Sequence, residues 1–250
     1  LVERIDAALR AAGVERRVYN PWDESFGDDL PIFIQAATVL RERLDEPRVL
    51  CNVPTTTYYG RPPVGPERAL APHCNAWWVY GTLTDEERAR ELARGTWLMG
   101  RFEPEGPARA RAAAGLLRWR RREMGGNWWA YDVMKGSANT QLDGPSWGDR
   151  CLSYPTVPPS PRLAWEWTRV GHEDLRYLAT LERWVAEGAP EDSRAARRAV
   201  RRGERLLEEL REAVDPTSSD ALEAPEAYEE ARERVLEALL ALHEARAASP

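Results

Sequence analysis

Residues 75–101 read NAWWVYGTLTDEERARELARGTWLMGR, and they contain one complete strand, helix, strand pattern. The first six residues of this stretch are mostly large and apolar, which is typical of a buried β-strand. Thr84 followed by Glu87 is a capping-box signature, so we expect a helix to begin there and to end at Gly95. The last six residues predict a second strand. Two strands joined by one helix through short connections are expected to be parallel neighbours.

The same alternation continues on both sides of this stretch. We expect further strands at residues 17–20, 48–53 and 127–132, and helices at residues 1–12, 31–44 and 107–124. An open doubly wound sheet would also alternate in this way, but it usually carries a glycine-rich phosphate turn. Neither GxGxxG nor GxxxxGK[ST] occurs in the chain. The favoured fold is therefore α/β, namely the C-terminal portion of a (β/α)8 barrel with about five parallel β/α units.

The remainder of the chain is expected to be helical. A long loop at residues 134–161 precedes a helix whose apolar face runs from Leu163 to Val185. Two more helices are expected at about 193–214 and 225–246, and their composition of Ala, Arg, Glu and Leu is typical of packing elements. These patterns predict a partial catalytic-type barrel at residues 1–186 and a C-terminal helical segment at residues 187–250.

Composition and charge exclude several classes of protein. The 250 residues are 43% hydrophobic and 30% charged, and the net charge of −6 gives no pull toward nucleic acid or an anionic membrane. Acidic residues follow the basic run from Arg194 to Arg205 at helical spacing and offset its charge, so the run predicts a solvated helix face. No window approaches the roughly 18 apolar residues that a membrane span needs. Leu1 already lies in an expected helix, so a signal peptide for secretion or periplasmic export would lie upstream.

The cysteines predict neither a disulfide framework nor a zinc site. Cys51, Cys74 and Cys151 are odd in number, widely spaced and without a CxxC pair. Buried free thiols are the expected state. We therefore expect no metal and no cofactor.

Aromatic and acidic residues gather where the predicted strands end. In barrel enzymes the reactive groups lie at the carboxyl ends of the strands and in the loops that follow. Asp23 and Glu24 come directly after the first predicted strand, and Asp132 closes the fifth. Carboxylates among flat aromatic rings are typical of a sugar-cleaving cleft. The residues expected to bind substrate there are Trp22, Tyr58, Asn75, Trp78, Tyr80, Trp97, Tyr131 and Asp132.

A pattern that follows the predicted strands resembles a known family. It consists of Tyr154-Pro155, then PRLAWE at residues 161–166, then RVGHEDLRYL at residues 169–178. This is similar to the closing signature of glycoside hydrolase family 123, which reads roughly YP…P…RxEAxRDGIEDYEYL. The resemblance covers about residues 14–185.

The resemblance implies hydrolysis of a terminal 2-acetamido-2-deoxy sugar, as by an N-acetylgalactosaminidase or hexosaminidase, through substrate-assisted catalysis. In such enzymes an adjacent Asp-Glu pair follows the fourth barrel strand, and Asp23 and Glu24 match that pair. Glu24 would then protonate the glycosidic oxygen, while Asp23 would orient the acetamide whose carbonyl attacks the anomeric carbon. The resemblance also implies that the missing N-terminal barrel units come from the rest of a longer chain.

The charged residues of the signature have a simpler interpretation than substrate contact. Arg162, Arg169, Glu173 and Asp174 alternate in sign along one predicted helix. We expect them to form ion pairs between that helix and the barrel.

Two other functions remain open at this point. The chain could be a catalytically silent carbohydrate-binding or structural relative that keeps the aromatic cleft. It could also be a retaining glycosidase that uses Glu24 and Asp132 without help from the substrate. In that case the two carboxyl groups would lie about 5 Å apart.

Overall fold

The computed structural model describes most of the chain and divides it into two compact units. The described residues are 1–15, 17–21, 29–54, 70, 72–80, 83–102, 107–128, 153–154, 160–161, 163–188, 193–216 and 225–247. Unit 1 consists of residues 1–101 and 123–127, and unit 2 consists of residues 102–122 and 128–250. Each unit has a hydrophobic core of its own.

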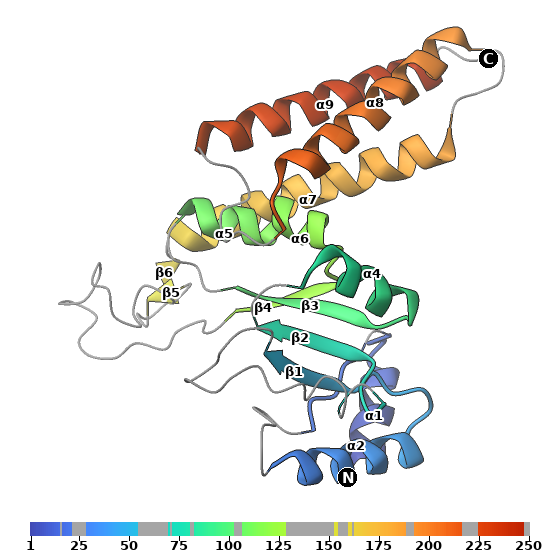
Figure 1. The fold of residues 1–250 in the computed structure, drawn as a ribbon, viewed down its shortest axis with the longest axis vertical. Coiled ribbons are helices and arrows are strands. Elements are labelled where there is room, and N and C mark those ends of the chain that lie inside the picture. The colour runs from blue at the N-terminus through green and yellow to red at the C-terminus, as the bar shows by residue number, and fades with distance from the viewer. Residues whose placement is uncertain are drawn as a thin grey trace. The chain divides into compact units, whose positions relative to one another are not determined.

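Unit 1 is built on a four-stranded sheet whose strand order follows the chain order (Figure 1). Its strands are β1 (Leu50–Pro54), β2 (Ala76–Tyr80), β3 (Trp97–Phe102) and β4 (Gly125–Trp128). β1 pairs in parallel with β2, and β2 pairs in parallel with β3. Tyr19 adds a parallel bridge to Val49 on the outer side of β1. The α/β class and the parallel strand pairing predicted from the sequence are confirmed.

The strand side chains alternate between the two faces of the sheet. Cys51, Trp77, Val79 and Leu98 pack into one core cluster. This cluster also includes residues of α2 (Leu30–Arg43), with partly buried residues of α1 (Val2–Ala11) and α4 (Asp85–Ala93) packed against it. The side chains that alternate with these along the strands lie on the opposite face, where Leu50, Ala76 and Trp78 form a second cluster. This two-residue period explains why the neighbours Trp77 and Trp78 enter different cores.

The helix signals in the sequence act as expected in unit 1. The Thr84 side chain accepts a hydrogen bond from the Glu87 amide at 3.2 Å, and the Glu87 carboxylate accepts one from the Thr84 amide at 2.8 Å. These two hydrogen bonds form a capping box at the start of α4, which confirms the capping box predicted from Thr84 and Glu87. Pro31 lies in the first turn of α2, where its missing N–H costs no helical hydrogen bond.

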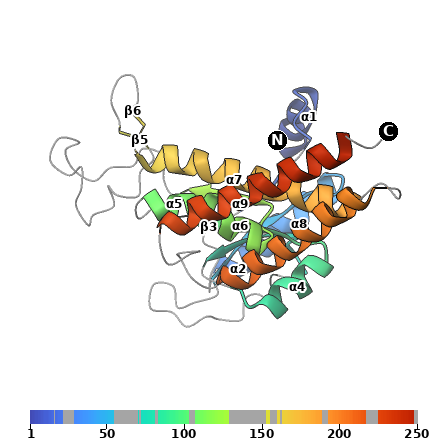
Figure 2. The same cartoon turned by 90° about the horizontal axis from the view of Figure 1, so that it is seen from above.

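The described part of unit 2 is mostly helical and also contains the short antiparallel pair β5 (Ser153–Tyr154) and β6 (Ser160–Pro161). The helices are α5 (Pro107–Ala114), α6 (Leu116–Arg121), α7 (Leu163–Glu187), α8 (Arg194–Ala213) and α9 (Pro225–Ala247). Helices α7, α8 and α9 lie side by side and share a core of Leu, Ala and Val residues (Figures 1 and 2). The predicted boundary between residues 186 and 187 therefore falls in the last turn of α7, inside one compact unit.

Three local features differ from the sequence-based expectations. The helix expected over residues 107–124 is broken at Gly115 into α5 and α6. A Cβ at Gly115 would lie 2.8 Å from the Gly171 carbonyl oxygen, so the break coincides with a close approach of α7. The strand expected at residues 127–132 begins two residues earlier, at Gly125. The strand expected at residues 17–20 is present as the single bridge of Tyr19.

The described helices include none that is both long enough and apolar enough to cross a membrane.

Candidate functional site

The candidate site lies at the carboxyl-end edge of the parallel sheet. β1, β2 and β3 are parallel, and the bridge of Tyr19 to Val49 gives residues 17–20 the same direction. The carboxyl ends of these segments therefore meet at one edge, and Asp23 and Glu24 follow the first of them in the chain. Six of the predicted site residues lie outside the described residues: Trp22, Asp23, Glu24, Tyr58, Tyr131 and Asp132.

Asn75 and Trp97 lie at the other edge, at the amino ends of β2 and β3. The Asn75 side-chain oxygen accepts a hydrogen bond from the Val49 amide at 2.8 Å, and its amide nitrogen donates to the Pro47 carbonyl at 3.2 Å. The Trp97 ring lies under the Arg48 guanidinium, whose central carbon is 4.8 Å from the ring centroid. Both side chains thus hold the amino-end edge of the sheet together, and the structure does not bring them to the carboxyl ends.

Trp78 and Tyr80 lie on β2 and approach the carboxyl-end edge. Trp78 is buried beside Leu50 and Ala76, on the face of the sheet that points away from α2. The Trp78 ring therefore belongs to the small core on that face of the sheet. Tyr80 is the last residue of β2, two positions further toward the same edge.

A polar cluster occupies the amino-end edge of unit 1. Asp6 of α1 is buried and accepts hydrogen bonds from the Tyr19 hydroxyl and from Arg10 Nε, the latter at 2.7 Å. Arg17 Nε lies 2.9 Å from the same carboxylate. The hydrogen bond from Tyr19, followed by that from Arg10, holds the pKa of Asp6 below its ordinary value. The carboxylate is therefore ionised at neutral pH, and it anchors α1 to the segment that follows.

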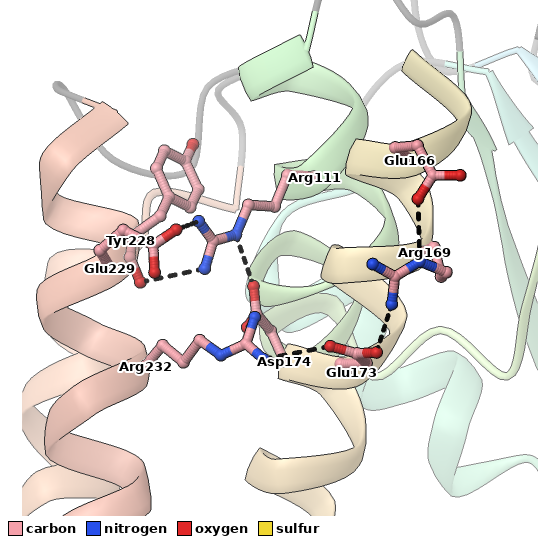
Figure 3. Close-up of polar contacts among 8 residues, drawn as sticks. All are labelled: Arg111, Glu166, Arg169, Glu173, Asp174, Tyr228, Glu229 and Arg232. Carbon is pink, nitrogen blue, oxygen red and sulfur yellow. Dashed lines mark hydrogen bonds and ion pairs between the residues drawn. The ribbon is translucent and has the colours of Figure 1, made fainter. Parts of the chain in front are cut away.

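A second polar cluster lies inside unit 2 and is drawn in Figure 3. Its centre is Arg111 of α5, whose side chain is about 1% exposed. Arg111 Nε donates to Asp174 Oδ2 of α7 at 2.7 Å, and Nη1 donates to the Glu229 carboxylate of α9. The Arg111 guanidinium also lies over the Trp167 ring, at 5.6 Å from its centroid. One arginine thus links three helices of unit 2.

The signature acids on α7 extend this cluster toward α9. Arg232 of α9 donates to Glu173 at 3.1 Å and lies 3.5 Å from the Asp174 carboxylate. Arg169 pairs along α7 with Glu166 at 3.0 Å and with Glu173 at 2.5 Å. The structure shows ion pairs for three of the signature residues, Arg169, Glu173 and Asp174, whereas Arg162 lies outside the described residues.

The electrostatics of the second cluster fit a structural role. Burial raises the pKa of Asp174, although the hydrogen bond and charge of Arg111 oppose that rise. Burial alone would lower the pKa of Arg111, but its bonds to Asp174 and Glu229 raise it above the ordinary value. Arg111 therefore stays charged, and its donors are already engaged by protein acceptors. The contacts of Arg111 with Asp174 and Glu229 therefore tie α5, α7 and α9 together.

Comparison with known proteins adds no assignment: no protein-family model matches the chain, and no curated protein has a significantly similar sequence. Among the described residues, no group of three or more His, Cys, Asp or Glu side chains is arranged to hold a metal ion. Cys51 and Cys74 are buried free thiols, as expected, and Cys151 lies outside the described part of the chain.

The sequence did not single out Arg111, Glu229 or Arg232. Arg111 lies in the alanine-rich stretch PARARAAA beside Arg109, and nothing in the local pattern distinguishes the two arginines. The alternating charges of α7 were the available signal, because they predicted ion pairs between that helix and the barrel. The structure places the partners on α5 and α9 of unit 2 and on α7 itself. The partner residues were not readable, since the pairs centred on Arg111 join residues 63 and 118 positions apart.

Proposed function

We propose that the chain is part of a (β/α)8-barrel glycoside hydrolase acting on a terminal 2-acetamido-2-deoxy sugar. Glu24 is the general acid and Asp23 orients the substrate acetamide. The observation that carries the proposal is the direction of residues 17–20. They run parallel to β1, so the Asp23-Glu24 pair follows a carboxyl end at the edge where barrel enzymes hold their catalytic groups.

The strand order supports the barrel part of the proposal. From residues 17–20 through β4, each strand lies next to the one that precedes it in the chain. A singly wound barrel has this order, whereas a doubly wound sheet reverses it at a switch point. The missing glycine-rich phosphate turn agrees with the barrel.

The proposed reaction breaks the bond between the anomeric carbon and the glycosidic oxygen. The acetamide carbonyl oxygen of the substrate forms a new bond to that carbon, while Glu24 gives its proton to the leaving oxygen. Asp23 accepts a hydrogen bond from the acetamide N–H, which makes the carbonyl oxygen a better nucleophile and stabilises the positive ring that forms. Trp78, on the face of β2 that would line the barrel, supplies an apolar wall.

The test is a panel of aryl glycosides with and without a 2-acetamido group. We expect turnover only of the 2-acetamido substrates. Turnover of both kinds would favour a retaining pair of protein carboxylates, Glu24 and Asp132. Binding without turnover by a correctly folded chain would favour the carbohydrate-binding alternative. The panel should be assayed on this chain and on a longer form that adds N-terminal barrel units.

A further inference from the structure

One backbone edge of unit 1 is open within the described residues. The Tyr19 N–H donates to the Arg48 carbonyl and the Tyr19 carbonyl accepts from the Leu50 N–H, both at 2.8 Å. In a parallel pairing, alternate residues point their N–H and C=O groups to opposite sides. Val18 and Asn20 therefore direct theirs away from β1. Neither amide makes a hydrogen bond within the described part of the chain.

A groove of about 850 Å³ runs along this open edge. Val18 and Tyr19 both line it, although Tyr19 packs against the α2 side of the sheet and Val18 against the other side. The free space therefore surrounds the edge of the strand and does not cover one face alone. Ile32 and Val39 of α2 line the groove and are 44% and 45% exposed, which is unusual for large apolar side chains of a parallel α/β unit.

Helix α1 faces the same groove with its apolar side. Val2, Ile5 and Leu9 recur at helical spacing and all line the groove. α1 precedes residues 17–20 as α4 precedes β3, and α4 is the helix that connects the parallel strands β2 and β3. A connecting helix in a β-α-β unit packs on the strand before it as well as on the strand after it. The apolar side of α1 thus has the position of a surface that covers a preceding strand.

We propose that residues 17–20 and the groove between α1 and α2 are the docking site for one parallel β-strand. That strand belongs to the polypeptide segment that precedes α1, and its binding makes α1 the connecting helix of a complete β-α-β unit. Backbone N–H and C=O groups of the docked strand form hydrogen bonds with those of Val18 and Asn20. Because the groove is lined by apolar residues from both faces of the sheet, the strand carries apolar side chains on both of its own faces. The proposal rests on the barrel part of the proposed function and on the open strand edge, and it does not depend on the proposed hydrolysis.

Hydrogen exchange at single amides tests this directly. The 250-residue chain is compared with a form that also carries the residues encoded before Leu1, and a gene that encodes no such residues would overturn the proposal. We expect the Val18 and Asn20 amides to exchange freely in the 250-residue chain and at least about 100-fold more slowly in the extended protein. The Leu50 amide, which bonds to Tyr19, is the internal control and should be protected in both. Free exchange at Val18 and Asn20 in the extended protein, with Leu50 protected, would overturn the proposal. Protection that grows with concentration and follows dimer formation in the 250-residue chain would overturn it in favour of a second copy.

A matched pair of variants gives a second readout. Asn20→Pro removes the backbone N–H that would donate a hydrogen bond to a carbonyl of the docked strand, whereas Asn20→Ala keeps this N–H. Asn20 is exposed, so the two variants should melt alike in the 250-residue chain. In the extended protein, Asn20→Pro should melt about 2–4 °C below Asn20→Ala. Equal melting temperatures in both forms would contradict the docking of a strand at this edge.

Discussion

Arg111 Nε and Asp174 Oδ2 lie 2.7 Å apart and join α5 to α7 through an ion pair that is almost entirely buried. Asp174 belongs to the run of alternating charges on α7 for which the sequence predicts ion pairs. The charged side chains around it are Arg111 of α5 and Glu229 and Arg232 of α9, all within unit 2. The pair therefore gives Asp174 a role in packing α7 against α5.

Removing one member of this pair should cost much more stability than removing both. Arg111→Met leaves the Asp174 carboxylate buried without its main partner, so we expect the free energy of unfolding to fall by about 3–5 kcal/mol. The double variant Arg111→Met/Asp174→Leu should recover most of that loss, since no buried charge remains. Urea unfolding followed by tryptophan fluorescence measures both. Arg169→Met, which breaks exposed pairs on α7, is the control and should change little. Equal losses in the single and double variants would show that the pair itself is stabilising.

Close packing of α5 on α7 should make Gly171 intolerant of a methyl group. A Cβ at Gly171 would lie 2.4 Å from the Arg111 carbonyl oxygen, which is backbone and cannot rotate away. We expect Gly171→Ala to destabilise unit 2 by about 1–3 kcal/mol, although alanine is the better helix former.

Gly203 of α8 is the matched control for this change. Its Cβ would meet the methyl ends of Val185 and Leu181, at 2.8 and 3.3 Å, and these side chains can adjust. Gly203→Ala should therefore cost clearly less than Gly171→Ala. The reverse order of melting temperatures would mean that the helix crossing at Gly171 is looser than the structure indicates.

Asp6 should make unit 1 sensitive to acid. Its folded pKa lies below the ordinary value of 3.8, chiefly through hydrogen bonds from Tyr19 and Arg10. Its contribution to stability is then present above pH 3.8 and is lost as the pH falls through the folded pKa. We expect the stability of the unsubstituted chain to drop more steeply below about pH 4 than that of Asp6→Asn. Urea unfolding between pH 3 and pH 7 measures the two slopes, and parallel curves would remove Asp6 from the acid response.

Local signals predicted much of the fold, because the relevant contacts are close in sequence. The Thr84 and Glu87 cap, Pro31 in the first turn of α2, and the period of the β2 side chains all act within a few residues. The break at Gly115 was not predictable, since it coincides with a contact to Gly171 on another helix. The roles of the site residues were harder to read. Their positions beside predicted strands put Asn75 and Trp97 among the expected substrate contacts. The parallel pairing of β1, β2 and β3 shows that the amino ends of these strands lie together at the opposite edge.

The acid role proposed for Glu24 predicts a dependence on the leaving group. Glu24→Gln cannot donate the proton that a poor leaving group needs, while an activated aryl group leaves without it. We expect a much larger loss of kcat/KM on alkyl or sugar aglycones than on nitrophenyl ones. A similar loss on both substrate types would assign Glu24 a binding or folding role.

The most direct test of the proposed hydrolysis is the effect of Asp23→Asn on turnover and on binding of a thiazoline mimic of the cyclised intermediate. Asn keeps the shape of the side chain but loses the charge, so turnover of a 2-acetamido substrate should fall by about two to four orders of magnitude, or roughly 3–5 kcal/mol. The mimic should bind the unsubstituted protein tightly and the variant weakly, because the interaction belongs to the transition state. Circular dichroism should be unchanged. If the mimic binds both forms alike, or does not bind an active preparation, the acetamide-assisted mechanism is wrong for this protein.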